Sequence, residues 1–493
     1  MKERPEQEQM RFAKLKALKE KGFNYPNDIK VTASSLDVLE SPIVDGKSEE
    51  RLSIAGRIMQ LRVMGKAMFA HILDGKGKVQ IYIRSSDVGQ ETYEQCKNFD
   101  LGDIIAVKGF PFITKTGEHT LHAESVTLLV KSLIPPPEKW HGLTDEEARY
   151  RYRYVDLFSN LEVRERFRKR AEIIRFIRNF LDNRGFLEVE TPCLHHVAGG
   201  ATARPFKTHH NALGIDMYLR IALELPLKKL IVGGLERVYE ISRVFRNEGI
   251  SRKHNPEFTM LEFYQAFATF EDMMDLTEDL ICEAAEEING SLVLPWGEKT
   301  IDLKRPWKRI SMLDAIHELG GVERSLDLNE VSSLHSIAAK HRVHLEDPSD
   351  WGRCLEAVFE SLVEEKLIDP IFIMNHPFSI SPLARKNLKD PKITDRFELF
   401  INGMEMANAF SELNDPVDQR ERFEAQARRK IAGDKEACDV DEDFLRALEY
   451  GLPPTGGEGM GIDRLVMFLT NVSTIRDVVL FPQLKPEEGE LDE

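Results

Sequence analysis

The chain has 493 residues, which is more than a single hydrophobic core usually serves, so two or three domains are expected. Hydrophobic residues make up 42% and charged residues 30% of the sequence, and no apolar run approaches the ~18–20 residues of a membrane span, which excludes a membrane protein. The formal net charge of −16 argues against nucleic-acid binding over a broad surface. Any contact with a polyanion must be local.

The N-terminus and the cysteines indicate a cytoplasmic protein. The first residues, MKERPEQEQMRFAKLKALKEKG, lack the apolar core of a secretory signal. The five cysteines form no CxxC pair, which excludes a disulfide framework and a thiolate zinc site: Cys96, Cys193, Cys282, Cys354 and Cys438. We therefore expect free thiols.

A short basic helix is predicted within residues 1–30. Met10, Leu15 and Leu18 stand among alternating charges over residues 8–21, and the helix should end near Gly22. This segment carries eight Lys or Arg against five Asp or Glu. A solvated helix without a partner is the open alternative.

Residues 31–137 are expected to form a small β-domain. Between 52 and 132 the hydrophobic period is two, in five runs separated by turns such as DGKG and KTGE. Five short strands favour a closed barrel of the oligonucleotide-binding (OB) type. The prolines at 135–137 then introduce a stiff linker over 138–160.

A second domain is expected over 161–493. It opens with an amphipathic helix over 161–184 that ends at Gly185 and runs into the extended segment FLEVETP. Mixed β and α patterns follow, and the region from about 270 to 345 reads as mostly helical. There is no internal repeat.

The first stretch with chemical character runs from Arg243 to Phe258. An arginine that ends a strand, followed by a polar loop with His254 and Asn255 and then an aromatic, can hold a phosphate and stack a base. A surface hairpin with ordinary salt bridges is the alternative.

The second stretch, Gly456–Arg464, reads as a glycine-rich turn that opens an apolar helix. Glycines let a ligand approach the backbone, and Arg464 adds a full charge for an anion. It is neither a Rossmann fingerprint nor a Walker loop, and a purely structural turn is the alternative.

The third stretch runs from Glu398 to Glu412. A turn at Asn402-Gly403 would make it a hairpin, with Asn408, Phe410 and Glu412 on one face of the second strand. Carboxylates in the middle of a sheet are costly unless they bind a metal or an ammonium group, so a cation-binding site is favoured.

In this order the stretches resemble the signature motifs of the class II aminoacyl-tRNA synthetases. FLEVETP is similar to motif 1, FRNEG with HNPEF to motif 2, and GMGIDRL to motif 3. GGATARPFKTHHNALGIDMYLRIALEL and NAFSELNDP resemble the lysyl-tRNA synthetases within this class, and the resemblance covers nearly the whole chain. It implies an α+β fold: a five-stranded OB-type barrel and a catalytic domain with an antiparallel sheet flanked by helices. It also implies a homodimer built on motif 1.

The resemblance implies an ATP site and a magnesium site. Arg246 and Arg464 are the expected catalytic residues, on the α- and γ-phosphates respectively. Glu398 and Glu405 match the family's Mg²⁺ ligands. The residues expected to bind ATP are Arg246, Glu248, His254, Asn255, Phe258 and Arg464.

It further implies that L-lysine and tRNA(Lys) are the substrates. Glu412 with Tyr264 would receive the ε-ammonium, and Glu224 with the backbone near Gly200 the α-amine, because a buried carboxylate detects a cation. Glu262, Asn408 and Phe410 complete the lysine site. In the barrel, Phe69 and Gln80 match anticodon-reading positions, by stacking and hydrogen bonding. Without the resemblance, Phe69 would be read as a core residue.

Four residues depart from the common pattern of the family: Leu61, Pro226, Ala409 and Glu458. The methyl of Ala409 could tighten the pocket, and the carboxylate of Glu458 would repel ATP unless it points away. The acidic pocket argues against an aspartyl or asparaginyl enzyme. The barrel argues against a protein-modifying paralogue, and the four charged motif residues against an inactive RNA-binding relative.

Overall fold

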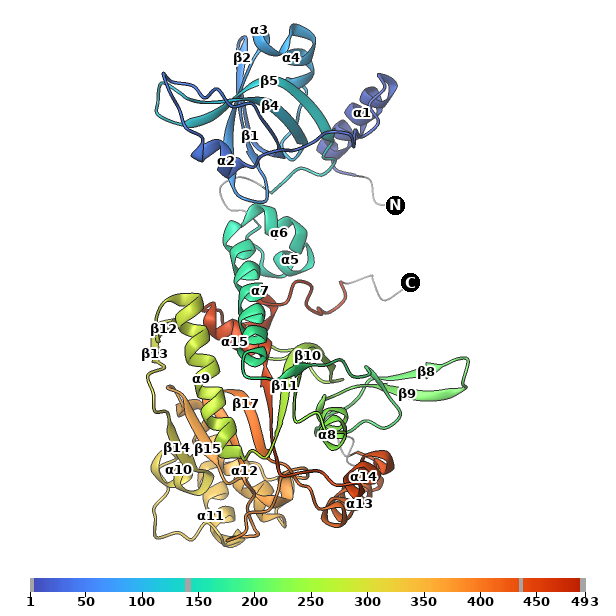
Figure 1. The fold of residues 1–493 in the computed structure, drawn as a ribbon, viewed down its shortest axis with the longest axis vertical. Helices are drawn as coiled ribbons and strands as arrows, with labels where there is room; N and C mark the ends of the chain where they lie inside the picture. Colours follow the sequence, from blue (N-terminus) through green and yellow to red (C-terminus); the bar gives the residue numbers. More distant parts are fainter. Residues whose placement is uncertain (1–3, 138–142, 434–437, 488–493) are drawn as a thin grey trace. The chain divides into compact units, whose positions relative to one another are not determined.

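The structure is a computed structural model that describes residues 4–137, 143–433 and 438–487. The chain divides into two compact units, Met1–Leu161 and Glu162–Glu493, and each is described by itself. Figure 1 shows the path of the chain through both units.

The first unit contains a closed five-stranded barrel with strand order β1-β2-β3-β5-β4, which confirms the predicted OB-type barrel. Side chains alternate between a buried interior and the surface, as the period of two predicts. The turn after β2 is held by Asp74, whose Oδ1 accepts from the backbone N–H groups of Lys76 and Gly77 at 2.7 and 2.9 Å. The strands are β1 (Leu52–Met64), β2 (Ala67–Leu73), β3 (Lys78–Arg84), β4 (Ile104–Ile113) and β5 (His119–Val130).

The basic N-terminal helix, α1 (Glu6–Glu20), is attached to the barrel. Arg11 donates to the carbonyl oxygens of Leu101 and Ser132 at 2.9 and 3.2 Å, and Lys14 forms an ion pair with Asp100 at 2.7 Å. These contacts hold the helix on the barrel through two of its cations.

The first unit also contains short helices, two of which lie in the expected linker. In segment 138–160, α5 (Glu146–Arg151) and α6 (Arg153–Ser159) stand in place of a stiff connection, and within α6 Arg153 and Asp156 form a buried ion pair at 2.8 Å. Residues 138–142 lie outside the described residues. The other helices are α2 (Ser35–Glu40), α3 (Ser85–Val88) and α4 (Gln90–Cys96).

The second unit is built on an eight-stranded sheet with the order β14-β15-β16-β17-β18-β11-β10-β6. All neighbours are antiparallel except β14–β15 and β10–β6, which confirms the α+β class. The strands are β6 (Leu187–Glu188), β10 (Arg237–Phe245), β11 (Glu257–Ala266), β14 (Lys308–Ser311), β15 (Ile371–Met374), β16 (Arg396–Ile401), β17 (Met404–Ser411) and β18 (Thr455–Gly461).

Two details of this sheet bear on the predictions. The hairpin β16–β17 turns at Asn402 and Gly403, with φ of 50° and 63°, as predicted. The prediction of a glycine-rich turn is wrong, since residues 455–461 form the central strand β18. The helix α15 (Ile462–Leu469) begins only after this strand. Sheet pairing on both sides overrides the weak strand preference of glycine.

Helices cover both faces of the sheet (Figure 1). On one face α7 (Leu161–Asp182), α9 (Phe270–Asn289) and α15 share a hydrophobic core with the strands. On the other face a second core joins α8 (Glu224–Val232) and α14 (Glu442–Glu449) to β10 and β11. The helices α10 (Met312–Glu318) and α12 (Trp351–Leu362) pack with α11 (Val331–His341) in a third core, and α13 (Pro416–Ile431) follows β17.

The region 270–345 is less uniformly helical than expected. Besides α9, α10 and α11 it contains β14 and the hairpin β12 (Val293–Trp296) and β13 (Lys299–Asp302). A further small sheet joins β7 (Leu194–His195), β8 (Lys207–His210) and β9 (Ile215–Leu219), and Figure 1 shows the β8–β9 hairpin projecting away from the main sheet.

Candidate active site

A cavity of about 470 Å³ lies over the β10–β11–β18–β17 part of the sheet. It collects most of the predicted site residues from segments far apart in the sequence. They are Gly200, Glu224, Arg246, Glu248, His254, Asn255, Phe258, Glu262, Tyr264, Glu405, Asn408, Phe410 and Arg464. Glu398 and Glu412 are not among the described residues that line it.

One end of the cavity is rich in arginine. Arg246 directly follows β10, and its guanidinium carbon lies 5.2 Å from the centre of the Phe258 ring on β11. Burial lowers the pKa of Arg246, and the charge of Glu248 opposes this shift. Arg464, on the first turn of α15, donates to the backbone oxygen of Glu405 at 2.5 Å. Two cations and an aromatic ring therefore face one space, which suits a nucleotide with several phosphates.

The loop between β10 and β11 is held by its own polar side chains. Asn255 is buried, donates to the carbonyl of Glu257 at 2.7 Å and accepts from the backbone N–H of Gln483 at 3.1 Å. His254 Nδ1 lies 2.9 Å from the hydroxyl of Ser251, and burial lowers the pKa of His254. The side-chain amide of Asn255 therefore stabilises the loop as both a donor and an acceptor of hydrogen bonds.

Glu398 and Glu405, predicted to hold a metal, sit on the neighbouring strands β16 and β17. Each is next to an arginine: Arg396 donates to Glu398 at 2.6 Å, and Arg464 lies 3.3 Å from Glu405. Burial raises the pKa of Glu364, and the charges of Glu360, Glu398 and Glu405 add to this shift. Two carboxylates in a negative field are suitable oxygen ligands for Mg²⁺ if phosphates supply further ones. Among the described residues, no group of three or more potential ligands forms a complete metal site.

The opposite end of the cavity is acidic and contains Glu224 and Glu262. Glu262 accepts from the Tyr264 hydroxyl at 2.9 Å and from the backbone N–H of Leu223 at 2.8 Å. Burial raises the pKa of Glu262 to about 7, and the charge of Glu224 adds to this shift. Gly200, with φ of +89°, would place a Cβ 3.0 Å from that of Ala222, so a side chain there would crowd this end.

Glu412 lies behind the acidic end and has a partner that the sequence analysis missed. Its carboxylate contacts the ammonium of Lys228, which also lies 2.5 Å from Glu224. Both Glu412 and Lys228 are buried. The sequence carries a signal for the contact of Lys228 with Glu224 only, since Lys228 follows Glu224 by four residues and so shares its helix face.

The strand β18 has a glycine where it faces Glu412 and Tyr264. A Cβ on Gly457 would lie 2.1 Å from Glu412 Oε1 and 2.4 Å from the Tyr264 ring, whereas one on Gly456 would meet Met273 of α9 on the other face. Alternation along β18 thus leaves the face toward Glu412 and Tyr264 without side chains.

The same alternation explains two of the departures from the family pattern, Glu458 and Ala409. The carboxylate of Glu458 points toward α9, where it accepts from the Thr277 hydroxyl at 2.5 Å, and Ala409 packs in the core of that face. Neither side chain crowds the cavity. Pro226 lies in the first turn of α8, where backbone N–H groups have no acceptor within the helix. Because proline has no N–H group, it is tolerated at this position.

The barrel carries an aromatic surface around the predicted anticodon residues. Phe69 is half-buried between the core residues Met68 and Ala70, and its ring lies 4.9 Å from that of Tyr82. The core interpretation of Phe69 is therefore wrong. Gln80 donates to Glu118 at 2.7 Å and accepts from the Thr120 hydroxyl at 2.9 Å.

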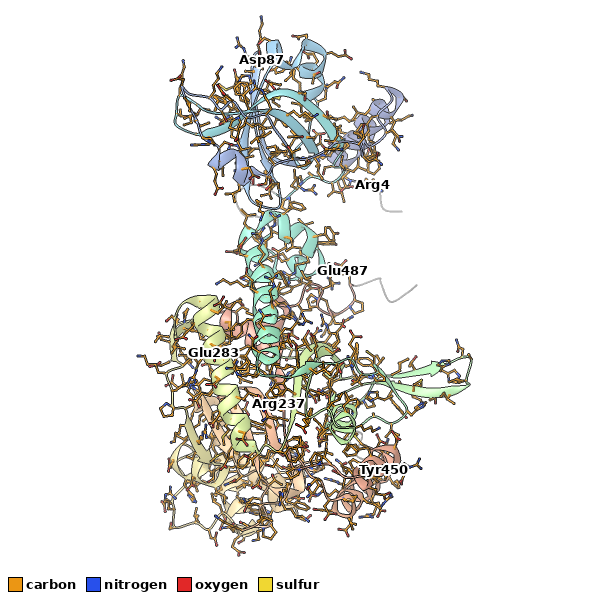
Figure 2. The ribbon with its side chains drawn as sticks, viewed as in Figure 1. Arg4, Asp87, Arg237, Glu283, Tyr450 and Glu487 are labelled. Atoms are coloured by element: carbon orange, nitrogen blue, oxygen red, sulfur yellow. The ribbon has the colours of Figure 1, made fainter. Side chains whose placement is uncertain are left out.

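Sequence reasoning missed the extent of this surface. The His122 ring lies 5.2 Å from Tyr82 and 4.7 Å from Phe110, and its Nε2 lies 2.8 Å from the carboxylate of Asp87, labelled in Figure 2. Phe112 adds a further ring 5.9 Å from Tyr82. Outward positions of β3, β4 and β5 carry these rings, a pattern that strand alternation could have disclosed.

Comparison with known protein families places both units. The model of the tRNA synthetases class II (D, K and N) matches residues 145–485, and that of the OB-fold nucleic acid binding domain matches residues 52–129. The larger match covers more than half of the chain, so the fold and the cavity are those of a class II tRNA synthetase.

Individual relatives define the family more closely. The lysine–tRNA ligase of Pelotomaculum thermopropionicum is 54% identical over 483 residues, which cover 97% of this chain and 95% of the relative. The lysine–tRNA ligases of Listeria innocua and Bacillus subtilis are 52% and 51% identical, each over 97% of both chains. The chain belongs to the lysine–tRNA ligase family. Within the described residues, no helix has the length and apolarity to cross a lipid bilayer.

Proposed function

We propose that the chain is a lysine–tRNA ligase, which joins L-lysine to ATP as lysyl-adenylate with release of pyrophosphate and then transfers lysine to the 3′ end of tRNA(Lys). One observation carries the proposal: a single cavity has an arginine-rich end with Arg246 and Arg464 and an acidic end with Glu224 and Glu262. Lysine with its two ammonium groups matches the second end, and ATP matches the first.

In the first step the lysine carboxylate attacks the α-phosphorus, and pyrophosphate leaves. Arg246 is proposed to pair with the α-phosphate while Phe258 stacks on adenine, and the distance of 5.2 Å between the Arg246 guanidinium carbon and the centre of the Phe258 ring supports this pairing of roles. Arg464 neutralises the departing phosphates. No side chain is needed as a general base, because the attacking carboxylate is already ionised.

Glu248, His254 and Asn255 complete the nucleotide end from the loop between β10 and β11. Glu398 and Glu405 would hold Mg²⁺ together with ATP phosphates, and the ion would supply charge neutralisation to the pyrophosphate. Both carboxylates would then exchange contacts with Arg396 and Arg464 for contacts with the metal.

Lysine selection is proposed to depend on the acidic end. Glu224 and the backbone at Gly200 would receive the α-amine, and Glu412 with Tyr264 the ε-ammonium. Glu262 holds Tyr264 through its hydroxyl hydrogen bond. Asn408 and Phe410 form the walls, and Asn408 is itself fixed by Arg396, which donates to it at 3.0 Å.

The barrel is proposed to bind the anticodon. Phe69 offers a ring for stacking a base, and the pair Gln80–Glu118 offers hydrogen-bonding groups beside it. The net charge of −16 is compatible with this local mode of recognition, in which stacking contributes more than a basic surface.

A homodimer is proposed on the motif 1 side. The edge strand β6 exposes Leu187 at 51%, and Leu194 is exposed at 42% a few residues later. Unpaired edges with apolar side chains favour association with another chain. A cytoplasmic location fits this function.

Pyrophosphate exchange tests the proposed function directly. Purified protein with ATP and Mg²⁺ should incorporate labelled pyrophosphate into ATP only when lysine is added. Aspartate and asparagine serve as the control substrates, because they are used by the neighbouring members of the class. Exchange with either of these but not with lysine would disprove the assignment.

A further inference from the structure

The acidic end contains a positive charge of its own. Lys228 on α8 has no exposed surface, its Nζ lies 2.5 Å from Glu224 Oε1, and it contacts Glu412 as well. The rings of Phe410 and Phe444 enclose the ammonium at 5.5 and 5.8 Å from their centres. The enzyme thus keeps an alkylammonium group directly behind the site proposed for the substrate's ammonium groups.

Carboxyl groups outnumber the ammonium group at this end when lysine is absent. Glu224, Glu262 and Glu412 bring three carboxylates, and Lys228 brings one ammonium. Lysine adds two more. The charged or titratable groups that face Lys228 or its two partners come from α8, β11, β16 and the segment after β17: Glu224, Glu262, Tyr264, Arg396 and Glu412.

Lys228 differs from the groups that meet the cavity. It is not among the described residues that line the space, so it does not compete with the substrate for volume. Its effect must pass through Glu224 and Glu412, which it bridges from α8 to the segment after β17. Burial raises the pKa of Glu224 and of Glu412, and the charge of Lys228 opposes this shift. Without this cation both carboxyls would retain protons to higher pH, and a protonated carboxyl attracts an ammonium poorly.

We propose that Lys228 is a positioning residue that determines specificity: its ammonium holds the carboxyl groups of Glu224 and Glu412 in place, so that the acidic end accepts an amino acid with two ammonium groups. The inference rests on the proposed activation of lysine. It adds a residue that acts on the substrate through its carboxylate partners.

The chain offers a matched control in the next residue. Lys229 is partly exposed and pairs with Asp443 at 2.6 Å at the surface. Lys228→Met and Lys229→Met remove the same charge from adjacent positions of one helix with little change in side-chain length. Pyrophosphate exchange then gives KM for lysine, KM for ATP and the pH profile of kcat/KM for each variant.

Lys228→Met should raise KM for lysine by about tenfold or more, leave KM for ATP within about twofold, and move the pH profile for lysine to higher pH, because the carboxylates lose their cation. Lys229→Met should change none of these values by more than about twofold. In Lys228→Ala, added propylammonium should lower KM for lysine toward the wild-type value, and propanol should not.

Three results would overturn the proposal. In the first, Lys228→Met has the same KM for lysine and the same pH profile as Lys229→Met. In the second, Lys228→Met raises KM for lysine and KM for ATP together and leaves the pH profile unchanged, as expected for a residue with only a structural role. If Lys228→Met does not fold, Lys228→Arg decides, since it keeps the charge but moves it, and an unchanged KM for lysine then refutes positioning. A wild-type protein without lysine-dependent exchange refutes the proposed function instead.

Discussion

The carboxyl group of Glu262 connects lysine binding to pH. Burial raises its pKa to about 7, so below that pH the free enzyme holds a proton that an incoming ammonium group must displace. We expect kcat/KM for lysine to rise with pH up to about 7 and to level off above it. One pH unit below this pKa only about a tenth of the carboxyl is ionised, so kcat/KM should fall roughly tenfold.

Exchange rates between pH 5.5 and 8.5 at limiting lysine measure this profile. Glu262→Gln should abolish the inflection, because the amide does not titrate. A wild-type profile that is flat across pH 7 would show that Glu262 is ionised before lysine binds.

Gly457 is the residue where an added methyl group is most costly to the acidic end. A Cβ there would lie 2.1 Å from Glu412 Oε1, so Gly457→Ala must displace the carboxylate or the Tyr264 ring. We expect KM for lysine to rise by about tenfold or more with KM for ATP nearly unchanged. Gly459→Ala is the control, since its Cβ would find its nearest neighbour at 3.6 Å and should have a smaller effect.

At this scale the sequence identified most of the cavity's residues but not their pairing. Arg246, Phe258 and Arg464 could be assigned because the motifs that contain them are distinctive. The bond between Lys228 and Glu412 could not, because it joins α8 to a segment that begins after β17. Only the packing of these elements brings the two charges together.

At the scale of the elements, the buried carboxyl of Glu458 on β18 is hydrogen-bonded to Thr277 on α9. Burial raises the pKa of Glu458 to about 8, above the value in the unfolded chain, so the group favours the folded state less and less as pH rises from about 4.5 to 8. Glu458→Gln keeps the acceptor for Thr277 and does not ionise. We expect it to raise the melting temperature at pH 8.5 by several degrees, an effect of about 1–4 kcal/mol, and to change it little at pH 5.

Thermal unfolding of both proteins at the two pH values tests this expectation. Glu449→Gln, at an exposed position at the end of α14, is the control and should change neither melting temperature. Equal stabilisation at pH 5 and pH 8.5 would rule out ionisation of Glu458 as the cause.

Substitutions on the outer face of β2 and β3 should weaken tRNA binding and leave adenylate formation unchanged. Phe69→Ala removes a stacking surface worth about 1–3 kcal/mol per base, which corresponds to a rise of roughly 5- to 150-fold in KM for tRNA(Lys). Because Phe69 is outside the barrel core, the melting temperature should be nearly unchanged. Aminoacylation and pyrophosphate exchange are measured side by side, and an equal loss in both would contradict the assignment.

The elements differ in how well the sequence predicts them. The barrel strands follow from their period of two, and the β16–β17 hairpin follows from Asn402-Gly403. The strand β18 was misread as a turn, because glycines carry no side-chain pattern and its strand form depends on pairing with β11 and β17. The helices α5 and α6 were missed in the expected linker, since they are too short for a periodic signal.

At the scale of the whole molecule, each compact unit has its own hydrophobic core. The barrel residues form one cluster, and the cores around the eight-stranded sheet contain none of them among the described residues. We expect two calorimetric transitions. Lysine with ATP, each at about 100 times its Kd, should stabilise only the transition of residues 162–493, by about 2.7 kcal/mol for each ligand. A single transition, or a shift of both, would show that the units unfold together.

The division between Leu161 and Glu162 separates two kinds of recognition. The surface proposed to read the anticodon and the cavity proposed to select the amino acid have no core residue in common, so mutations can alter one while sparing the other. The genetic code pairs a codon with lysine. In this protein that pairing then depends on the peptide chain that connects the two units at this boundary.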